Sequence, residues 1–210
     1  MMKAHRLGAL AAVLLIGSVT PAIAVPVTYS TSGVFESSRG ATLNQGGVQI
    51  RFNPVTNVTV DPPPSTNAIF GGFELLAAPG RPGFDVSDFF TLTITQSTPG
   101  PGNQSISFTS VVDGVIFTNN SQAFVQFSTS PQSIIAGGFA TTYRIVEGDE
   151  QNPGRLEILG NTGLVSTLNG EIGQTPTAVI PEPGTMALAC AALPLLGLGY
   201  ARRRRQMAQV

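Results

Sequence analysis

The strongest structural signal in the chain is the run Asp88-Phe89-Phe90-Thr91-Leu92-Thr93-Ile94-Thr95. Within it, Phe90, Leu92 and Ile94 alternate with three threonines, so one face is apolar and the other carries hydroxyls. Because successive side chains of a strand point to opposite faces, this alternation predicts a β-strand that is buried on one side only.

The same period-two alternation recurs along the middle of the chain. We expect further strands at residues 27–35, 47–52, 55–60, 68–76, 105–109, 123–127, 142–145, 155–158 and 164–172. Prolines and glycines separate them, as in Pro99-Gly100-Pro101-Gly102-Asn103, which predicts a hairpin loop. Asp113-Gly114 indicates either a two-residue hairpin turn or a bulge in one long strand.

These segments predict a single all-β domain over residues 25–179, of the β-sandwich or jelly-roll type. All twelve phenylalanines of the chain lie in this segment, and we expect them to supply much of its core. No stretch of about eleven residues or more in this segment shows the 3.6-residue period of an amphipathic helix.

The composition of this middle segment restricts its chemistry. The chain's single lysine, histidine and cysteine are Lys3, His5 and Cys190, all outside it. Ser-His-Asp or Cys-His catalysis and zinc sites built on histidine or cysteine are therefore excluded within one chain. Cys190 has two interpretations, a small apolar residue or a lipidation site. Five arginines against eleven carboxylates give a net charge of −6, which argues against a nucleic-acid partner.

Carboxylates are the remaining reactive groups. Asp85 and Asp88 are the closest acidic pair of the central region, but nothing marks them as facing a substrate. Glu147, Asp149 and Glu150 form one acidic cluster, which is either a weak calcium candidate or a solvated turn. Its spacing does not match a helix-loop-helix calcium site. We expect no cofactor, and no metal beyond that weak candidate.

The first part of the chain has the layout of a secretory signal peptide. A basic start precedes an apolar run over residues 7–19, and Ala22 and Ala24 form the small-residue pattern of a cleavage site. We expect signal peptidase to cut between Ala24 and Val25, which removes residues 1–24. An uncleaved membrane anchor is the alternative.

The last part of the chain contains three features in a fixed order. Two prolines hold Pro181-Glu182-Pro183 in an extended conformation. An uncharged run over residues 186–200 follows, which is short for a transmembrane helix. The cluster Arg202-Arg203-Arg204-Arg205 then favours a cytoplasmic end, so the chain before the helix should lie outside the cytoplasm.

This order resembles the PEP-CTERM sorting signal of Gram-negative bacteria, which would occupy residues 180–210. The resemblance implies that an exosortase-type membrane protease recognises Pro181, Glu182 and Pro183 and removes or replaces the tail. The precursor would then sit in the inner membrane through its C-terminal helix, and the mature protein at the cell surface or outside the cell. An ordinary single-pass anchor with a proline-rich stalk is the alternative.

Together these features predict an exported protein that is not an enzyme. The resemblance implies a structural role in a biofilm matrix, with exopolysaccharide as a partner. A carbohydrate-binding module is the second hypothesis, although Tyr29 and Tyr143 are the only tyrosines of the middle segment and tryptophan is absent. An enzyme that uses carboxylates alone is the third.

Overall fold

The computed structural model describes residues 25–62, 64–78, 83–117 and 120–177. All regular elements within these residues are β-strands. No helix in this part of the chain is long and apolar enough to cross a membrane. The predicted signal peptide and the predicted sorting signal lie outside the described residues.

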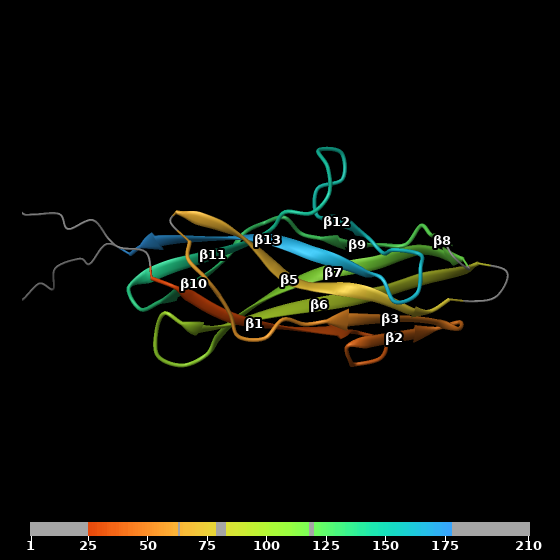
Figure 1. Cartoon of the computed structure of the whole chain (residues 1–210), viewed down its shortest axis with the longest axis horizontal. Helices are drawn as coiled ribbons and strands as arrows, with labels where there is room; N and C mark the ends of the chain where they lie inside the picture. Colours follow the sequence, from red (N-terminus) through yellow and green to blue (C-terminus); the bar gives the residue numbers. More distant parts are fainter. Residues whose placement is uncertain (1–24, 63, 79–82, 118–119, 178–210) are drawn as a thin grey trace, which may run out of the picture.

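The strands form two antiparallel sheets, which Figure 1 shows as two curled layers. Sheet A has seven strands in the order β12-β9-β7-β6-β1-β4, with β8 paired to β7. Its strands are β1 (Val27–Phe35), β4 (Val58–Val60), β6 (Phe84–Thr98), β7 (Gln104–Phe117), β8 (Asn120–Ser121), β9 (Phe124–Phe127) and β12 (Arg155–Glu157). Sheet B has six strands in the order β10-β11-β13-β5-β3-β2. Its strands are β2 (Thr42–Gln45), β3 (Val48–Asn53), β5 (Ser65–Ala77), β10 (Gln132–Ala136), β11 (Phe139–Ile145) and β13 (Val165–Pro176).

Aromatic rings hold the two sheets together. Phe90 of sheet A lies 4.9 Å from Phe73 of sheet B, measured between ring centroids, and Phe35 and Phe52 pack around both. Seven of the twelve phenylalanines are buried in this core, which confirms the expected role of most of them. Such ring pairs add stability beyond the area that they bury.

The hydroxyl groups of two buried tyrosines each donate a hydrogen bond inside the body. The Tyr143 hydroxyl donates to Oε1 of Gln96 at 2.8 Å, and the Tyr29 hydroxyl donates to the carbonyl of Ile69 at 2.8 Å. Both contacts join sheet A to sheet B, so they fix the position of one layer on the other. Tyr143 lies on the core face of β11.

The expected all-β class is confirmed, and so is the strand at residues 88–95. It is longer than expected, because β6 and β7 form one long hairpin across the predicted loop at residues 99–103. The turn interpretation of Asp113-Gly114 is wrong, because β7 continues through both residues. Gly114 has a φ of 123°, and a Cβ there would lie 2.4 Å from the carbonyl oxygen of Gln122.

Three strands have no counterpart among the expected segments: β2, β8 and β10. β2 and β10 are the two edge strands of sheet B, and β8 pairs only with the end of β7. Strands in such positions are short and have one neighbour, so their alternation is weak. Their residues pair because the longer strands beside them offer free backbone groups.

Candidate functional site

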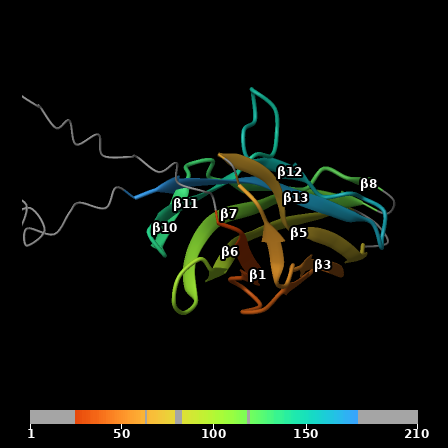
Figure 2. The same cartoon turned by 60° about the vertical axis from the view of Figure 1, so that its left-hand side comes forward.

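The beginning and the end of the described chain lie side by side. The backbone N–H of Val25 donates to Oε1 of Gln174 in β13 at 2.8 Å. Figures 1 and 2 show both ends of the coloured chain at the same end of the body. The predicted cleavage-site residues Ala22 and Ala24 lie outside the described residues. Pro181, Glu182, Pro183 and the arginines Arg202, Arg203, Arg204 and Arg205 also lie outside them.

The acidic cluster of Glu147, Asp149 and Glu150 lies on the loop that projects between β11 and β12 in Figure 1. Oδ1 of Asp149 accepts the backbone N–H groups of Gln151 at 3.0 Å and of Asn152 at 2.7 Å. The N–H of Asn152 is the main cause that lowers the Asp149 pKa below its ordinary value.

A carboxylate oxygen of Glu147 accepts the backbone N–H of Asn169, so this side chain holds the loop to β13. Within the described residues, no group of three or more acidic, histidine or cysteine side chains is arranged to hold a metal ion. The contacts of Glu147 and Asp149 stabilise this loop, and the solvated turn and the weak calcium candidate both stay predictions.

Asp85 and Asp88 do not face each other. They stand three positions apart on β6, and residues at that spacing point to opposite faces of a strand. The carboxylate of Asp88 accepts the Ser37 hydroxyl at 2.7 Å and the Ser37 backbone N–H at 3.2 Å. Asp88 therefore anchors the loop after β1, and this pair does not form the two-carboxylate arrangement of a glycosidase.

Exposed apolar side chains form a row on the outer face of sheet A. Phe89 of β6 is 60% exposed, and it stands directly opposite Val111 of β7, which is 40% exposed. Val34 of β1 is 45% exposed and lies diagonally across from Phe89. A large exposed aromatic side chain with apolar neighbours is a common feature of binding surfaces.

An open hollow of about 550 Å³ lies along one side of Phe89. It is lined by Val34, Glu36, Ser37, Arg39, Phe89 and Thr91, and we call it the Phe89 site. It thus combines an aromatic ring, an aliphatic side chain, one carboxylate, one guanidinium and two hydroxyls. Four of the six lining residues are polar, so the site offers several hydrogen-bonding groups beside a small apolar surface.

The loop that carries the polar side of this site is held in place. The Glu36 backbone N–H donates to the carbonyl of Phe89 at 2.9 Å, and the Arg39 N–H donates to the carbonyl of Phe35 at 2.8 Å. Arg39 has a φ of 53°, which is uncommon for a residue other than glycine. Among the described residues, neither the Glu36 carboxylate nor the Arg39 guanidinium has a hydrogen-bond or ion-pair partner.

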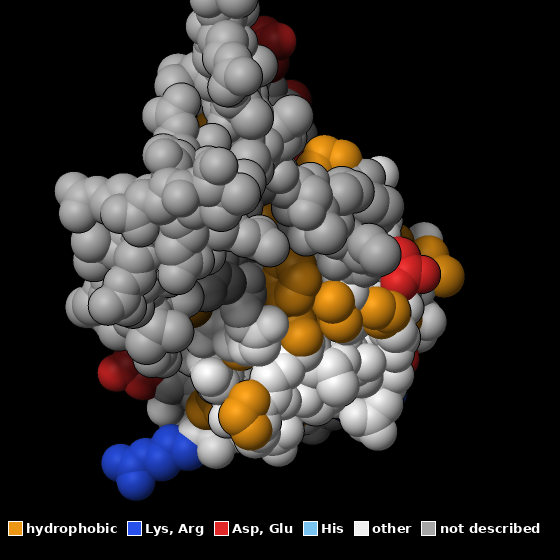
Figure 3. Space-filling model, turned by 90° about the vertical axis from the view of Figure 1, so that its left-hand side faces the viewer, with side chains coloured by type: hydrophobic (Ala, Val, Ile, Leu, Met, Phe, Trp, Pro, Cys, Tyr) orange, Lys and Arg blue, Asp and Glu red, His pale blue; other side chains and the backbone are white. Residues whose placement is uncertain are grey.

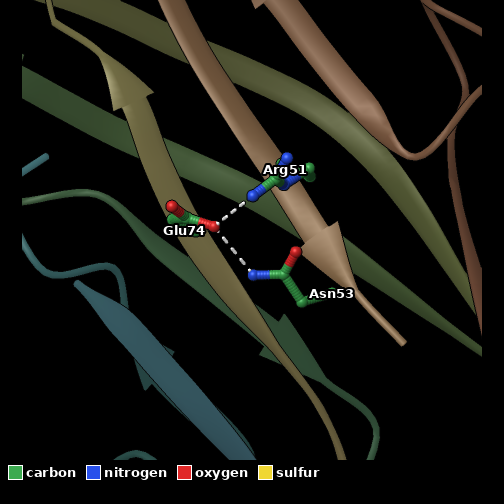
Figure 4. A network of polar contacts seen from close by, with 3 residues as sticks. All are labelled: Arg51, Asn53 and Glu74. Atoms are coloured by element: carbon green, nitrogen blue, oxygen red, sulfur yellow. Dashed lines mark hydrogen bonds and ion pairs between the residues drawn. The ribbon is translucent and has the colours of Figure 1, made fainter. Parts of the chain in front are cut away.

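Two pairs of oppositely charged side chains lie on sheet B. Figure 4 shows Glu74 of β5 between two residues of β3, with Arg51 at 2.7 Å and the side-chain amide of Asn53 at 2.9 Å. These contacts, Asn53 first, lower the pKa of Glu74. Arg144 and Glu171 pair in the same way across β11 and β13. Exposed pairs of this kind join neighbouring strands and contribute little stability.

A second hollow, of about 450 Å³, lies at the base of the projecting loop and is lined by Gly148, Asp149, Asn152, Arg155 and Glu157. The guanidinium of Arg155 stacks 3.8 Å above the centre of the Phe124 ring. This cation–π contact occupies the ring face that a ligand would use. The Phe89 site is therefore the better candidate, because its ring is uncovered.

The sequence contains a pattern that indicates an exposed position for Phe89. In the pair Phe89-Phe90, alternation places one ring on the buried face with Leu92 and Ile94, and the other ring on the hydroxyl face. An aromatic side chain on the hydroxyl face has no core to fill. Glu36 and Arg39 had no such signal, because their position beside Phe89 depends on the pairing of β1 with β6.

No protein-family model matches the chain, and comparison with curated proteins and with solved structures finds no match either.

Proposed function

We propose that this is an exported, non-enzymatic protein of the bacterial cell surface or extracellular matrix, with a jelly-roll-like β-sandwich as its body. An exosortase-type protease acts on its C-terminal tail, and the protein works in contact with exopolysaccharide. The observation that carries the proposal is the order of Pro181-Glu182-Pro183, an uncharged apolar run and four arginines in the tail. The two ends of the described chain lie at the same end of the body, which is compatible with it. A precursor held by a C-terminal helix would present the entire body on the outer side of the membrane.

The end from which both termini leave suits a position close to a membrane. Among the described side chains visible in Figure 3, apolar groups gather on this end and few charged groups appear. The N-terminal contact is also independent of the signal peptide, because Val25 is the first residue after the predicted cut. Cleavage would leave the hydrogen bond to Gln174 in place and would turn its donor into an ammonium group.

The sorting step is tested by replacing Pro181, Glu182 and Pro183 with alanine. We expect export to continue and processing to stop, because the extended peptide is no longer offered to the protease. The unprocessed form should then collect in the inner membrane, as fractionation with an antibody to the β body would show. A triple-alanine protein that reaches the surface at the size and amount of wild type would mean that the tail is an ordinary anchor.

A carbohydrate-binding module is the second candidate function, and the exposed row of Val34, Phe89 and Val111 favours it. Phe89 is 60% exposed and stands next to two other exposed apolar side chains, so these residues form a patch and not a single surface residue. The two candidates are compatible, since a matrix protein that holds polysaccharide fulfils both.

A further inference from the structure

We propose that the Phe89 site binds an uncharged polysaccharide, with a sugar ring resting on Phe89 and its hydroxyls held by Glu36 and Arg39. This inference rests on the proposed function, because it needs a protein that meets polysaccharide outside the cell. It adds a defined place of contact and a class of ligand.

The apolar part of the site is shaped for the carbon face of a ring. Phe89 projects from the middle of sheet A with Val34 and Val111 beside it, so the apolar surface is broad and shallow. A pyranose has one face of C–H groups that packs on an aromatic ring in this way. A deep apolar cavity, as a lipid chain or a steroid would need, does not fit an open hollow on a sheet face.

The polar part of the site matches the edge of the sugar ring, which carries the hydroxyl groups. The Glu36 carboxylate accepts hydrogen bonds and the Arg39 guanidinium donates them, so neighbouring hydroxyls of one sugar can use both. Both groups lack a partner among the described residues, so a ligand displaces no protein contact. An apolar ligand would instead strip water from two charges without replacing their hydrogen bonds.

The loop that carries these charges is already ordered. Asp88 holds Ser37 through its hydroxyl and its backbone N–H, and backbone hydrogen bonds fix Glu36 and Arg39. Binding therefore does not have to order the loop, which removes one of the usual costs of association.

A row of hydroxyls continues from the site along β6 and β7 and provides a path for a longer chain. Thr93 pairs with Ser107 at 3.2 Å and Thr95 with Ser105 at 2.9 Å, both on the outer face. From Thr91 to Thr95 this path covers about 13 Å at the usual rise of a strand. Each hydroxyl in a pair keeps a free lone pair or proton for a sugar.

The charge of the body selects against acidic chains. Residues 25–179 carry eleven carboxylates and five arginines, and Glu36 and Arg39 cancel each other within the site. A polyanion would meet net repulsion as it approached, whereas a neutral glycan would not. The proposal therefore commits to an uncharged polysaccharide.

The test is affinity electrophoresis of the purified full-length chain in mild detergent, in gels that contain neutral polysaccharides (soluble β-glucan, dextran or galactomannan) or anionic alginate. We expect at least one neutral polysaccharide to retard the wild type. Phe89→Ala should weaken that binding at least about tenfold, which corresponds to about 1.4 kcal/mol. Phe89→Trp, which keeps an aromatic platform, should preserve it. Ile135→Ala is the matched control, because Ile135 is 68% exposed but lies on sheet B, and it should bind as wild type does.

Three results would overturn the proposal: no retardation by any neutral polysaccharide, retardation by alginate alone, or equal binding by wild type and Phe89→Ala. Sedimentation of the same variants tests whether a second copy of the chain, and not a polysaccharide, occupies the Phe89 site. A wild-type dimer that Phe89→Ala turns into a monomer would identify a self-association surface instead. Binding is measured with purified protein, so its result does not depend on the result of the sorting experiment.

Discussion

Replacing Gly33 with alanine should destabilise the body, because the core leaves no room for a methyl group there. Gly33 lies on the inner side of β1, where a Cβ would stand 2.3 Å from Cζ of Phe90 and 2.5 Å from Cδ1 of Phe52. Phe90 cannot swing away easily, since Phe35 and Phe73 each pack 4.9 Å from it between ring centroids. The missing side chain at Gly33 thus provides the space that the aromatic cluster fills.

The size of the effect follows from two opposing terms. Forcing an extra carbon into a packed core costs about 1–3 kcal/mol. Alanine restricts the unfolded chain more than glycine does, which returns about 0.4–1 kcal/mol. We expect a net loss of about 1–2 kcal/mol, and for a body of this size each kcal/mol lowers the melting temperature by roughly 2–4 °C.

The measurement is thermal and urea unfolding followed by far-ultraviolet circular dichroism. Gly173→Ala in β13 is the matched control, because its Cβ would have no neighbour closer than 3.5 Å and its φ is ordinary. This control should be unchanged or slightly more stable. If Gly33→Ala is as stable as Gly173→Ala, the aromatic rings can shift to make space for the methyl group, and the packing argument is wrong.

Three further predictions concern the buried hydroxyls and the acidic loop. Tyr143→Phe should cost about 1–3 kcal/mol of stability, because Gln96 loses its buried partner; urea unfolding with unchanged stability would contradict this. Burial raises the pKa of Tyr29 to about 12 and also raises that of Tyr143, so both stay protonated in the folded state after they ionise in the unfolded chain. Stability should therefore be complete below about pH 10 and fall as the pH rises beyond it, and melting curves from pH 8 to 11.5 check the sign. Chelation should leave the melting temperature unchanged, since the contacts of Asp149 already stabilise its turn; a large drop with chelator would favour the calcium interpretation.

Much of the fold could be predicted because the long strands carry their own pattern. β6 places Phe90, Leu92 and Ile94 inside and three threonines outside, as its alternation indicated. The same holds for β1, whose bounds match the expected range of 27–35. In a sheet with one buried face, the apolar positions that alternate in the sequence are the positions that the fold buries.

The errors fall where local pattern is weak or ambiguous. Asp113-Gly114 has the composition of a tight turn, yet β6 on one side and β9 on the other keep β7 extended through it. The edge strands β2 and β10 were missed for a related reason. Their pairing comes from one neighbour, so their own residues need little β-forming pattern.

By itself, the sequence determined the class of the body and the limits of its chemistry. Alternation gave the all-β class, and the lack of histidine, lysine and cysteine in residues 25–179 removed most catalytic and metal chemistry. Only the tertiary structure decided the candidate site. Phe89 lies about fifty residues after Glu36 and Arg39 in the chain, and the antiparallel register of β1 on β6 brings the three together. Register depends on how both strands fill the shared core, and no local stretch of sequence contains that information.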